Sequence, residues 1–265
     1  MERIKQALER ARQERETDDG AGKVEPNNTV IAPGIQRRVA YTNTRVVPVA
    51  PAVLKRNKII GGINDDSIVT AYNMLRTQVL QRLQEQGWNS LAIVSANKGE
   101  GKTLTAINLA ISMAREVDKT VLLVDLDLRN PSICHHFDYE PDFGVADYLL
   151  HDIPLQKILF NPGIERLVVL PGIRSVFNSA ELLASAKMAQ LVEELKTRYP
   201  SRVVLFDLPP LLSAADALAF APYVEAALLV VADGETTKSA VTDALQMLKT
   251  TNVLGTVLNR QMGTV

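Results

Sequence analysis

The stretch that decides the fold is LAIVSANKGEGKTLTAINLAISMA, residues 91–114. Its first part, Leu91–Ser95, is apolar and partly β-branched, which predicts a strand buried on both faces. A glycine-containing segment follows at residues 96–101, and a helical pattern begins directly after it at Lys102. A strand, a glycine loop and a helix in this order are typical of a loop that wraps around phosphate groups.

The loop offers several groups suited to a nucleotide. Its glycines let the backbone turn with the amides pointing inward, and the following helix presents free N–H groups to an anion. Lys102 can reach the β- and γ-phosphates of ATP, and the Thr103 hydroxyl is placed to bind Mg²⁺. The predicted ATP-binding residues of the loop are Asn97, Lys98, Gly99, Glu100, Gly101, Lys102, Thr103 and Leu104. The general pattern has glycine at position 96; Ala96 is a departure that a tight turn accepts.

Apolar runs alternate with helical patterns over residues 64–265, which we take as one domain. This alternation predicts an α/β fold: a doubly wound, mostly parallel sheet with helices on both faces. The expected strands are Leu91–Ser95, Thr120–Asp125, Arg166–Leu170, Arg202–Asp207, Ala226–Ala232 and Gly255–Asn259. The expected helices are 66–85, 102–114, 180–199 and 237–250, the first capped by Asp65 or Asp66.

Two zones precede the predicted domain. Residues 1–17 carry apolar residues at helical spacing among mixed charges, which predicts a helix that is either solvated or docks on a partner. Residues 18–63 contain prolines and glycines, and no acidic residue occurs from Pro26 to Asn64. We expect a basic linker that is either a tether or a weak contact to an anionic membrane surface. Val46–Leu54 is apolar enough to pack along the domain instead.

Composition narrows the function classes. The formal net charge of −1 gives no general attraction to nucleic acid, so we expect no nucleic-acid partner. Cys134 is the single cysteine, which excludes an internal disulfide. No apolar run approaches the ~20 residues of a membrane span, and the charged N-terminus does not look like a signal peptide. We expect a cytoplasmic protein that can still dock at the inner face of a membrane.

Carboxylates end two of the predicted strands. Asp125 and Asp207 stand at these ends, and Asp127 follows Asp125 by two residues. In a parallel sheet such groups converge beyond the carboxyl ends of the strands. We predict a Mg²⁺ site at Thr103 and Asp207, with Asp125 as a further ligand candidate. Lys102 is then a catalytic candidate, and either Asp125 or Asp127 can orient or deprotonate an attacking hydroxyl.

Other polar residues near these strands are harder to assign. Arg129 can pair with Asp127, contact phosphate or reach a neighbouring subunit. Asn259 and Arg260 close the last predicted strand, and an asparagine amide suits the edge of a base. Cys134, two neighbouring histidines and Asp138 are set aside as a metal site, because metal ligands normally converge from separated turns.

Together these residues resemble the bacterial tyrosine-kinase family of exopolysaccharide and capsule assembly, within the MinD/ParA-like P-loop ATPases. The matching blocks are GEGKT (99–103), VLLVDLDLRNP (121–131), FGVADYLL (143–150), NSAELL (178–183), VVLFDLPP (203–210), Asp216-Ala217 and GTVLNR (255–260). The resemblance implies a Walker A loop in the first block, a Walker A′ motif at Asp125 and Asp127, and a Walker B aspartate at Asp207. It makes Asn259 and Arg260 candidates for the adenine pocket.

The family transfers the γ-phosphate of ATP to tyrosines in its own C-terminal tail, usually within a ring, together with a membrane-embedded chain-length regulator. Here the last tyrosine is Tyr223, which predicts a loss of tail autophosphorylation. The Glu-x-x-Arg-x-x-Arg pattern used in ring assembly reads Thr70, Asn73 and Arg76, which argues against an octamer and leaves other homo-oligomers open. Lys98 replaces the usual proline and can touch phosphate or face solvent.

Three functions follow from this comparison. The first is an ATP-hydrolysing or phosphoryl-transferring regulator of polysaccharide assembly. The second is a non-catalytic scaffold of the same machinery, gated by ATP. The third is a positioning ATPase of the MinD type, which fits less well because Asn97 stands where that group carries its signature lysine.

Overall fold

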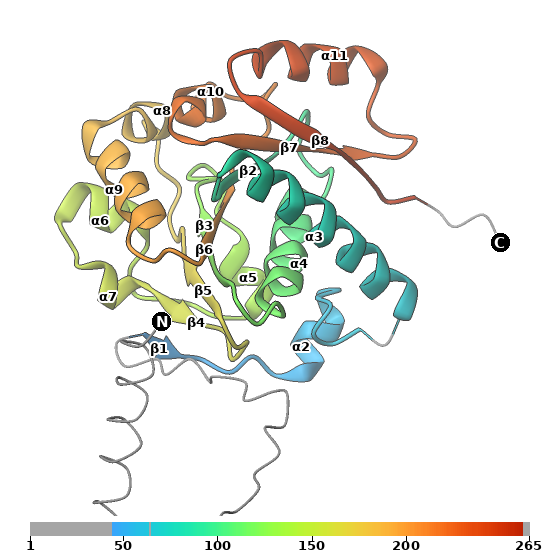
Figure 1. Ribbon diagram of the computed structural model, residues 1–265. Coiled ribbons are helices and arrows are strands. Elements are labelled where there is room, and N and C mark those ends of the chain that lie inside the picture. The colour runs from blue at the N-terminus through green and yellow to red at the C-terminus, as the bar shows by residue number, and fades with distance from the viewer. Residues whose placement is uncertain (1–43, 64, 262–265) are drawn as a thin grey trace, which may run out of the picture. The chain divides into compact units, whose positions relative to one another are not determined.

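The computed structural model describes residues 44–63 and 65–261 (Figure 1). The predicted helix at residues 1–17 lies outside these ranges, as does the predicted linker up to residue 43. The strands are β1 Arg45–Val46, β2 Ser90–Ser95, β3 Thr120–Asp125, β4 Phe160–Asn161, β5 Leu167–Leu170, β6 Arg202–Asp207, β7 Ala226–Ala232 and β8 Asn252–Asn259. The helices are α2 Pro51–Arg56, α3 Asp66–Gln86, α4 Lys102–Ala114, α5 Ile133–Phe137, α6 Val145–His151, α7 Leu155–Ile158, α8 Ser179–Leu183, α9 Ala186–Thr197, α10 Asp216–Phe220 and α11 Lys238–Met247, with a 3-10 turn at Ala221–Tyr223.

The described strands form one sheet in the order β1-β4-β5-β3-β6-β2-β7-β8. Among them, β4 and β5 pair antiparallel, and every other neighbouring pair is parallel. The chain passes from β2 through α4 to β3 and later returns to insert β6 between them. The predicted doubly wound, mostly parallel sheet is therefore confirmed.

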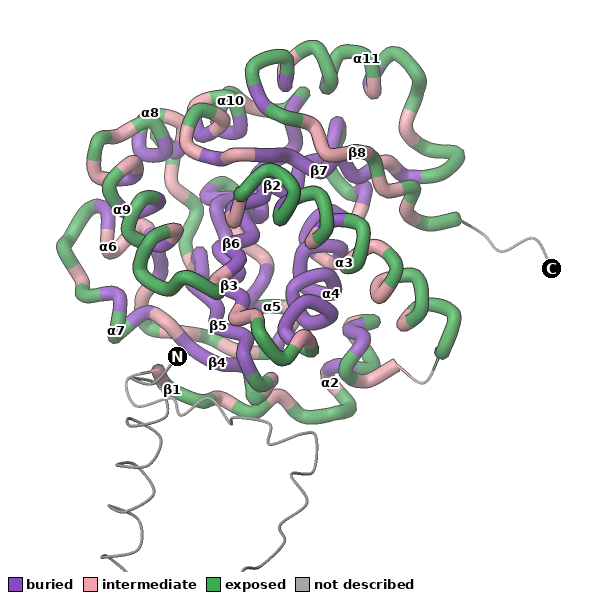
Figure 2. The backbone as a smooth tube through the Cα atoms, viewed as in Figure 1, coloured by how far each residue is buried: buried purple, intermediate pink, exposed green. Residues whose placement is uncertain are grey.

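Alternate residues of the central strands pack against opposite helical layers. In β2, Leu91 and Ile93 belong to a core shared with α3, α4 and α5, whereas Ala92 and Val94 belong to a core shared with α9, α10 and α11. Because both faces are covered, these strands read as continuous apolar runs in the sequence. Figure 2 shows the central strands and α4 as buried segments.

The helix that follows the phosphate loop is buried almost all round. Within α4, Leu104 is the one residue that is not buried. Its neighbour α3 begins at the cap Asp65, which accepts a hydrogen bond from the Ser67 amide, and ends at Gly87 in a left-handed conformation. A helix buried on almost every side needs neighbours on almost every side, and α3 lies alongside it as one of them (Figure 1).

The surviving arginine of the ring-assembly pattern contacts its own chain. Arg76 on α3 forms a salt bridge with Glu116 at 2.9 Å and donates to the Ser112 carbonyl of α4 at 3.3 Å. Asn73, one turn earlier, accepts a hydrogen bond from the Ser112 hydroxyl at 3.0 Å. These contacts fix α3 against the end of α4, and ring assembly through this helix stays a prediction.

The described part of the predicted linker is folded, which corrects the boundary at residue 63. β1 pairs with β4, and Leu54, Ile59 and Ile60 are buried in the core beside α4. The Ile60 amide donates to the side chain of Asn108 on α4 at 3.0 Å. Burial of these apolar side chains outweighs the turn-forming composition, so packing along the domain, the alternative expected for 46–54, extends to Ile59 and Ile60.

The single helix expected at 180–199 is wrong. The chain forms α8 and α9 instead, because Ser185 adopts an extended conformation and accepts a hydrogen bond from the Met188 amide. Serine favours this N-cap position, so a helix boundary was encoded there. Among residues 44–63 and 65–261, no helix combines the length and apolar character that a membrane crossing needs.

Candidate nucleotide-binding site

The predicted carboxylates meet because three neighbouring strands end beside one another. β3, β6 and β2 are adjacent in the sheet, and Asp125 at the end of β3 is in register with Asp207 at the end of β6. The loop of residues 96–101 leaves the end of β2 next to β6. Sheet order therefore brings together groups that lie about a hundred residues apart in the chain.

Lys102 is the centre of this cluster. Its ammonium group lies 2.9 Å from a carboxylate oxygen of Asp127 and 3.4 Å from one of Asp207. The Thr103 hydroxyl donates to the other oxygen of Asp207 at 2.6 Å. All four residues are buried or nearly so. One cation thus faces two carboxylates in a place with little water, where charge interactions are strong.

Asp125 occupies a different position from Asp127. One of its carboxylate oxygens accepts the amides of Ser132 and Ile133 at 2.9 and 3.0 Å, and the other accepts the Asp127 amide at 3.3 Å. These bonds tie the segment after β3 to the end of that strand. Asp125 is fully buried, whereas Asp127 lines the cavity beside the loop. The two residues are therefore not interchangeable.

Burial and the excess of carboxylates over cations shift the pKa values of three groups in this cluster. Burial, together with the negative charge of Asp207, raises the pKa of Asp125 to about 8. Burial also raises the pKa of Asp207, although Lys102 and Thr103 oppose that change. For Lys102, burial alone would lower the pKa, but attraction to Asp207 and Asp127 outweighs it, so the pKa lies above its usual value.

The backbone of the phosphate loop is held by the end of β8. Gly99 and Gly101 have φ angles of 88° and 90°, which glycine adopts without strain. The Asn259 amide donates to the Glu100 carbonyl at 2.9 Å, and the Arg260 guanidinium donates to the Gly99 carbonyl. In a trans peptide the N–H points opposite to the carbonyl. The amides of Glu100 and Gly101 therefore point away from β8.

Two predicted loop residues use their side chains within the protein. The buried carboxylate of Glu100 accepts hydrogen bonds from Asn97 at 3.1 Å and from Thr236 at 2.7 Å. The backbone amides of Asn97 and Glu100, rather than their side chains, are the groups that can bind a phosphate. Lys98 is exposed and lines the cavity beside the loop.

Two hollows adjoin the loop. A phosphate cavity of about 460 Å³ is lined by Lys98, Lys102, Thr103, Asp127 and Arg129 among others. A larger groove of about 810 Å³ lies between α3, α4 and β8, and its lining includes both Asn259 and Arg260. Gly101 and Leu104 line both hollows, so the groove and the phosphate cavity meet at the loop.

The structure resolves the partner of Arg129. Its Nε donates to both carboxylate oxygens of the buried Asp216, at 3.0 and 3.2 Å, and not to Asp127. Asp216 stands in a block that resembles the tyrosine-kinase family, but sequence reasoning gave it no role. Ser132 was also not predicted as a site residue, although its hydroxyl lies 3.4 Å from that of Thr103. Its place in the sequence, shortly after Asp127, could have indicated that it lies near the site.

The residues present fit a magnesium nucleotide. Thr103 and Asp207 place a hydroxyl and a carboxylate in contact, and Mg²⁺ in proteins uses few such ligands together with water and phosphate oxygens. Among the described residues, no group of three or more His, Cys, Asp or Glu side chains is arranged to hold a metal ion by itself. A cation held here would therefore share its shell with other oxygens, as a nucleotide's phosphates provide.

Comparison with known proteins gives a consistent result. A family model described as an AAA domain matches residues 89–263. The tyrosine-protein kinase YwqD of Bacillus subtilis (strain 168) is 34% identical over 190 residues, covering 71% of this chain and 79% of the relative. The kinase domain of the Escherichia coli tyrosine kinase ETK superposes with a TM-score of 0.69 at 27% identity, covering 83% of this chain and 92% of that one.

A second group of structures is more distant. The septum site-determining protein MinD from Pyrococcus horikoshii OT3, complexed with Mg-ADP, gives a TM-score of 0.55 at 26% identity, covering 65% of this chain and 70% of that one. This likeness covers less of the chain than the likeness to the kinase domain. On the matched sequence and the shared architecture, this chain belongs to the bacterial tyrosine-protein kinase family of P-loop ATPases.

Proposed function

We propose that this chain binds Mg²⁺ and ATP and transfers the terminal phosphoryl group to a tyrosine hydroxyl, or to water when no acceptor is present. The observation that carries the proposal is the Lys102 ammonium, 2.9 Å from Asp127 and 3.4 Å from Asp207, at the base of the phosphate cavity. Phosphoryl transfer is catalysed mainly by positioning and by charge stabilisation, and this cluster supplies fixed charge in a buried place.

Each residue of the cluster has a distinct task. Lys102 offsets negative charge on the phosphates, and Thr103 with Asp207 holds the cation. Asp127 is the carboxylate for the acceptor hydroxyl, because it lines the cavity and Asp125 does not. Asp125 holds the turn that carries Asp127, through its three backbone hydrogen bonds.

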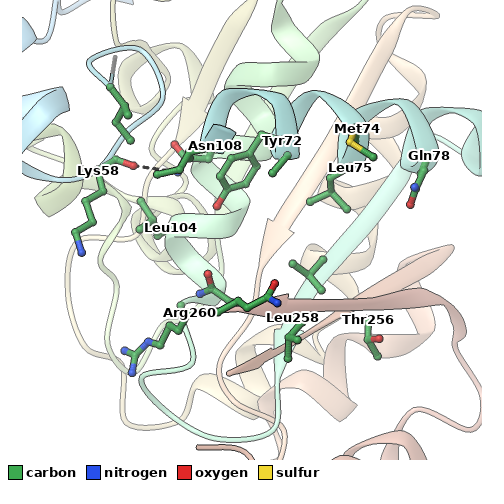
Figure 3. A pocket seen from close by; sticks show the side chains of 17 residues that line it. Lys58, Tyr72, Met74, Leu75, Gln78, Leu104, Asn108, Thr256, Leu258 and Arg260 are labelled. Carbon is green, nitrogen blue, oxygen red and sulfur yellow. Dashed lines mark hydrogen bonds between the residues drawn. The ribbon is translucent and has the colours of Figure 1, made fainter. Parts of the chain in front are cut away.

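The nucleoside belongs in the groove beside the loop. Figure 3 shows Tyr72 and Leu75 of α3 facing Leu258 and Arg260 across this groove, with Leu104 at the side of α4. Its volume of about 810 Å³ lies in the range usual for small-molecule sites. Apolar side chains with a few polar groups suit a flat base, and the groove opens onto the phosphate loop at Gly101. When bound, ATP supplies the phosphoryl group and Mg²⁺ offsets its charge.

In the cell, this activity would regulate exopolysaccharide or capsule assembly at the inner face of a membrane, together with a membrane-embedded chain-length regulator. Membership of the tyrosine-kinase family supports this role. The likeness to MinD favours a positioning ATPase as the second candidate. Against it, Asn97 is neutral and bonded to Glu100 of its own loop, so it offers no cation to a partner subunit.

Incubation of the purified full chain with γ-labelled ATP and Mg²⁺ tests the proposal. We expect phosphate release and, with a tyrosine-containing acceptor, phosphotyrosine detected by mass spectrometry. Lys102→Met should abolish both, while Lys119→Met, a lysine outside the two hollows at the loop, is the matched control. Nucleotide binding without turnover in the wild-type chain would support the ATP-gated scaffold instead.

A further inference from the structure

We propose that Arg129 is a second cationic ligand of the terminal phosphate and that Asp216 is the residue that positions it. This inference rests on the proposed function, because it concerns the same phosphate cavity. Arg129 lines that cavity together with Lys102 and Asp127. Its partner comes from α10, 87 residues further along the chain.

Arg129 is held in place by a buried acid. Asp216 is completely buried, and both of its carboxylate oxygens accept a hydrogen bond from the single Nε of Arg129. A guanidinium is planar and rigid, so fixing one nitrogen fixes the direction of the whole group. The arginine side chain is nevertheless 44% exposed. The side chain is therefore anchored to a buried acid and is still partly accessible.

The ion pair with Asp216 leaves most of the Arg129 donors available. Arginine carries five N–H donors, and Asp216 uses the one on Nε. Within residues 44–63 and 65–261, the terminal amino groups of Arg129 have no hydrogen-bond partner. Two rigid, adjacent amino groups match the oxygens of a phosphate. An ionised group with free donors at a cavity wall suits an anion better than the neutral hydroxyl of an acceptor.

The charge of Lys102 is partly taken up by protein carboxylates. Lys102 is shared between Asp127 and Asp207, so much of its charge is already balanced by protein carboxylates. The transferred γ-phosphoryl group spreads its charge over three equatorial oxygens, which need donors beyond Lys102. Besides Lys102, Arg129 is a cation of this cavity that a buried carboxylate holds in place, whereas Lys98 makes no ion pair with a described residue. On the proposed function Asp127 faces the acceptor end of the triphosphate, so Arg129, in the lining of the same cavity, should bind the γ-phosphate that ADP lacks.

Calorimetric titration of the full chain with Mg²⁺-ADP and with a non-hydrolysable Mg²⁺-ATP analogue tests this. Arg129→Gln should weaken binding of the triphosphate analogue about tenfold or more, as expected for a lost hydrogen bond between charged groups, and change ADP binding less than about twofold. Arg174→Gln, an exposed arginine outside the cavity, is the matched control. Equal losses for both nucleotides would overturn the proposal.

A double variant distinguishes two roles of Arg129: binding the phosphate, or only neutralising the charge of Asp216. Arg129→Gln alone leaves the buried Asp216 without its cation and can destabilise the fold, so thermal unfolding of each variant is measured first. In Arg129→Gln/Asp216→Asn, two neutral amides replace the ion pair. If Arg129 merely balances Asp216, the double variant binds the triphosphate like the wild type, which overturns the proposal. If Arg129 is a ligand, the double variant keeps the selective loss.

Asp216→Asn alone supplies the test of positioning. It keeps the cation and removes its charged anchor, so the triphosphate should bind more weakly than to the wild type but more tightly than to Arg129→Gln. Wild-type affinity in this variant would overturn the positioning role. A wild-type chain that binds neither nucleotide would refute the proposed function itself, and this result is distinct from any change confined to the Arg129 variants.

Discussion

Substitution of Gly101 by alanine tests how the phosphate loop is held. Gly101 has a φ of 90°, and a Cβ atom placed on it would lie 2.1 Å from the amide nitrogen of Asn259 and 3.4 Å from its Cγ. Contact at 2.1 Å is impossible, so the Asn259 side chain must rotate. Its hydrogen bond to the Glu100 carbonyl, 2.9 Å long, is then lost.

The expected magnitude has two parts. Holding alanine in this left-handed region costs roughly 1–2 kcal/mol. Loss of the hydrogen bond from Asn259 costs about 1 kcal/mol more. Gly101→Ala should therefore lower the free energy of unfolding by about 2–3 kcal/mol. In an Asn259→Ala background the bond is already absent and the clash is relieved, so only the strain remains.

Urea unfolding of the four chains of this double-mutant cycle, without nucleotide and with EDTA, measures the difference. Gly234→Ala is the matched control, because Gly234 has a φ of 69° with no atom within 4 Å of its added Cβ. The control should show strain alone, equal in both backgrounds. If Gly101→Ala were equally destabilising with and without the Asn259 side chain, that side chain would not hold the loop.

Two further predictions concern the buried acid and the segment before α3. In the nucleotide-free chain, unfolded Asp125 ionises near pH 3.8 while burial keeps the folded group protonated to about pH 8. Stability from this residue is therefore complete below pH 3.8 and falls by up to about 1.4 kcal/mol per pH unit as the pH rises through this interval. Asp125→Asn should flatten that decline in urea midpoints measured from pH 4 to 8; parallel profiles would contradict it. Ile59→Ala, at a fully buried side chain, should cost about 2–5 kcal/mol, whereas Val46→Ala, at a side chain 48% exposed, should change stability little; equal small effects would mean that residues 44–63 do not belong to the domain.

Much of the fold could be predicted because strands buried on both faces appear in the sequence as continuous apolar runs. The strands from β2 to β8 with four or more residues coincide with apolar runs, and the convergence of Asp125 and Asp207 follows from strand direction alone. β1 and β4 escaped prediction, because two residues carry no period. Only the tertiary pairing with β4 and the burial of Ile59 make residues 44–63 part of the domain.

The sequence predicted which residues form the site, but it did not predict which residues they contact. Lys102, Thr103 and Asp207 follow from the loop motif and the strand ends. The choice between Asp125 and Asp127 depends on which carboxylate the backbone amides occupy, and sequence carries no record of that. The pairing of Arg129 with a residue of α10 could not be predicted from the sequence either, because nothing in the spacing selects one of the thirty acidic residues.

The end of β8 joins the two halves of the site. Asn259 and Arg260 line the groove proposed for the nucleoside, yet both donate to carbonyls of the phosphate loop. Arg260 adopts a left-handed φ of 61° and pairs with Glu235 through both carboxylate oxygens, so its backbone and head are both constrained. Because a peptide is planar, these two hydrogen bonds also fix the directions of the Glu100 and Gly101 amides. The residues that line the groove proposed for the nucleoside therefore also hold the backbone proposed to receive the phosphates.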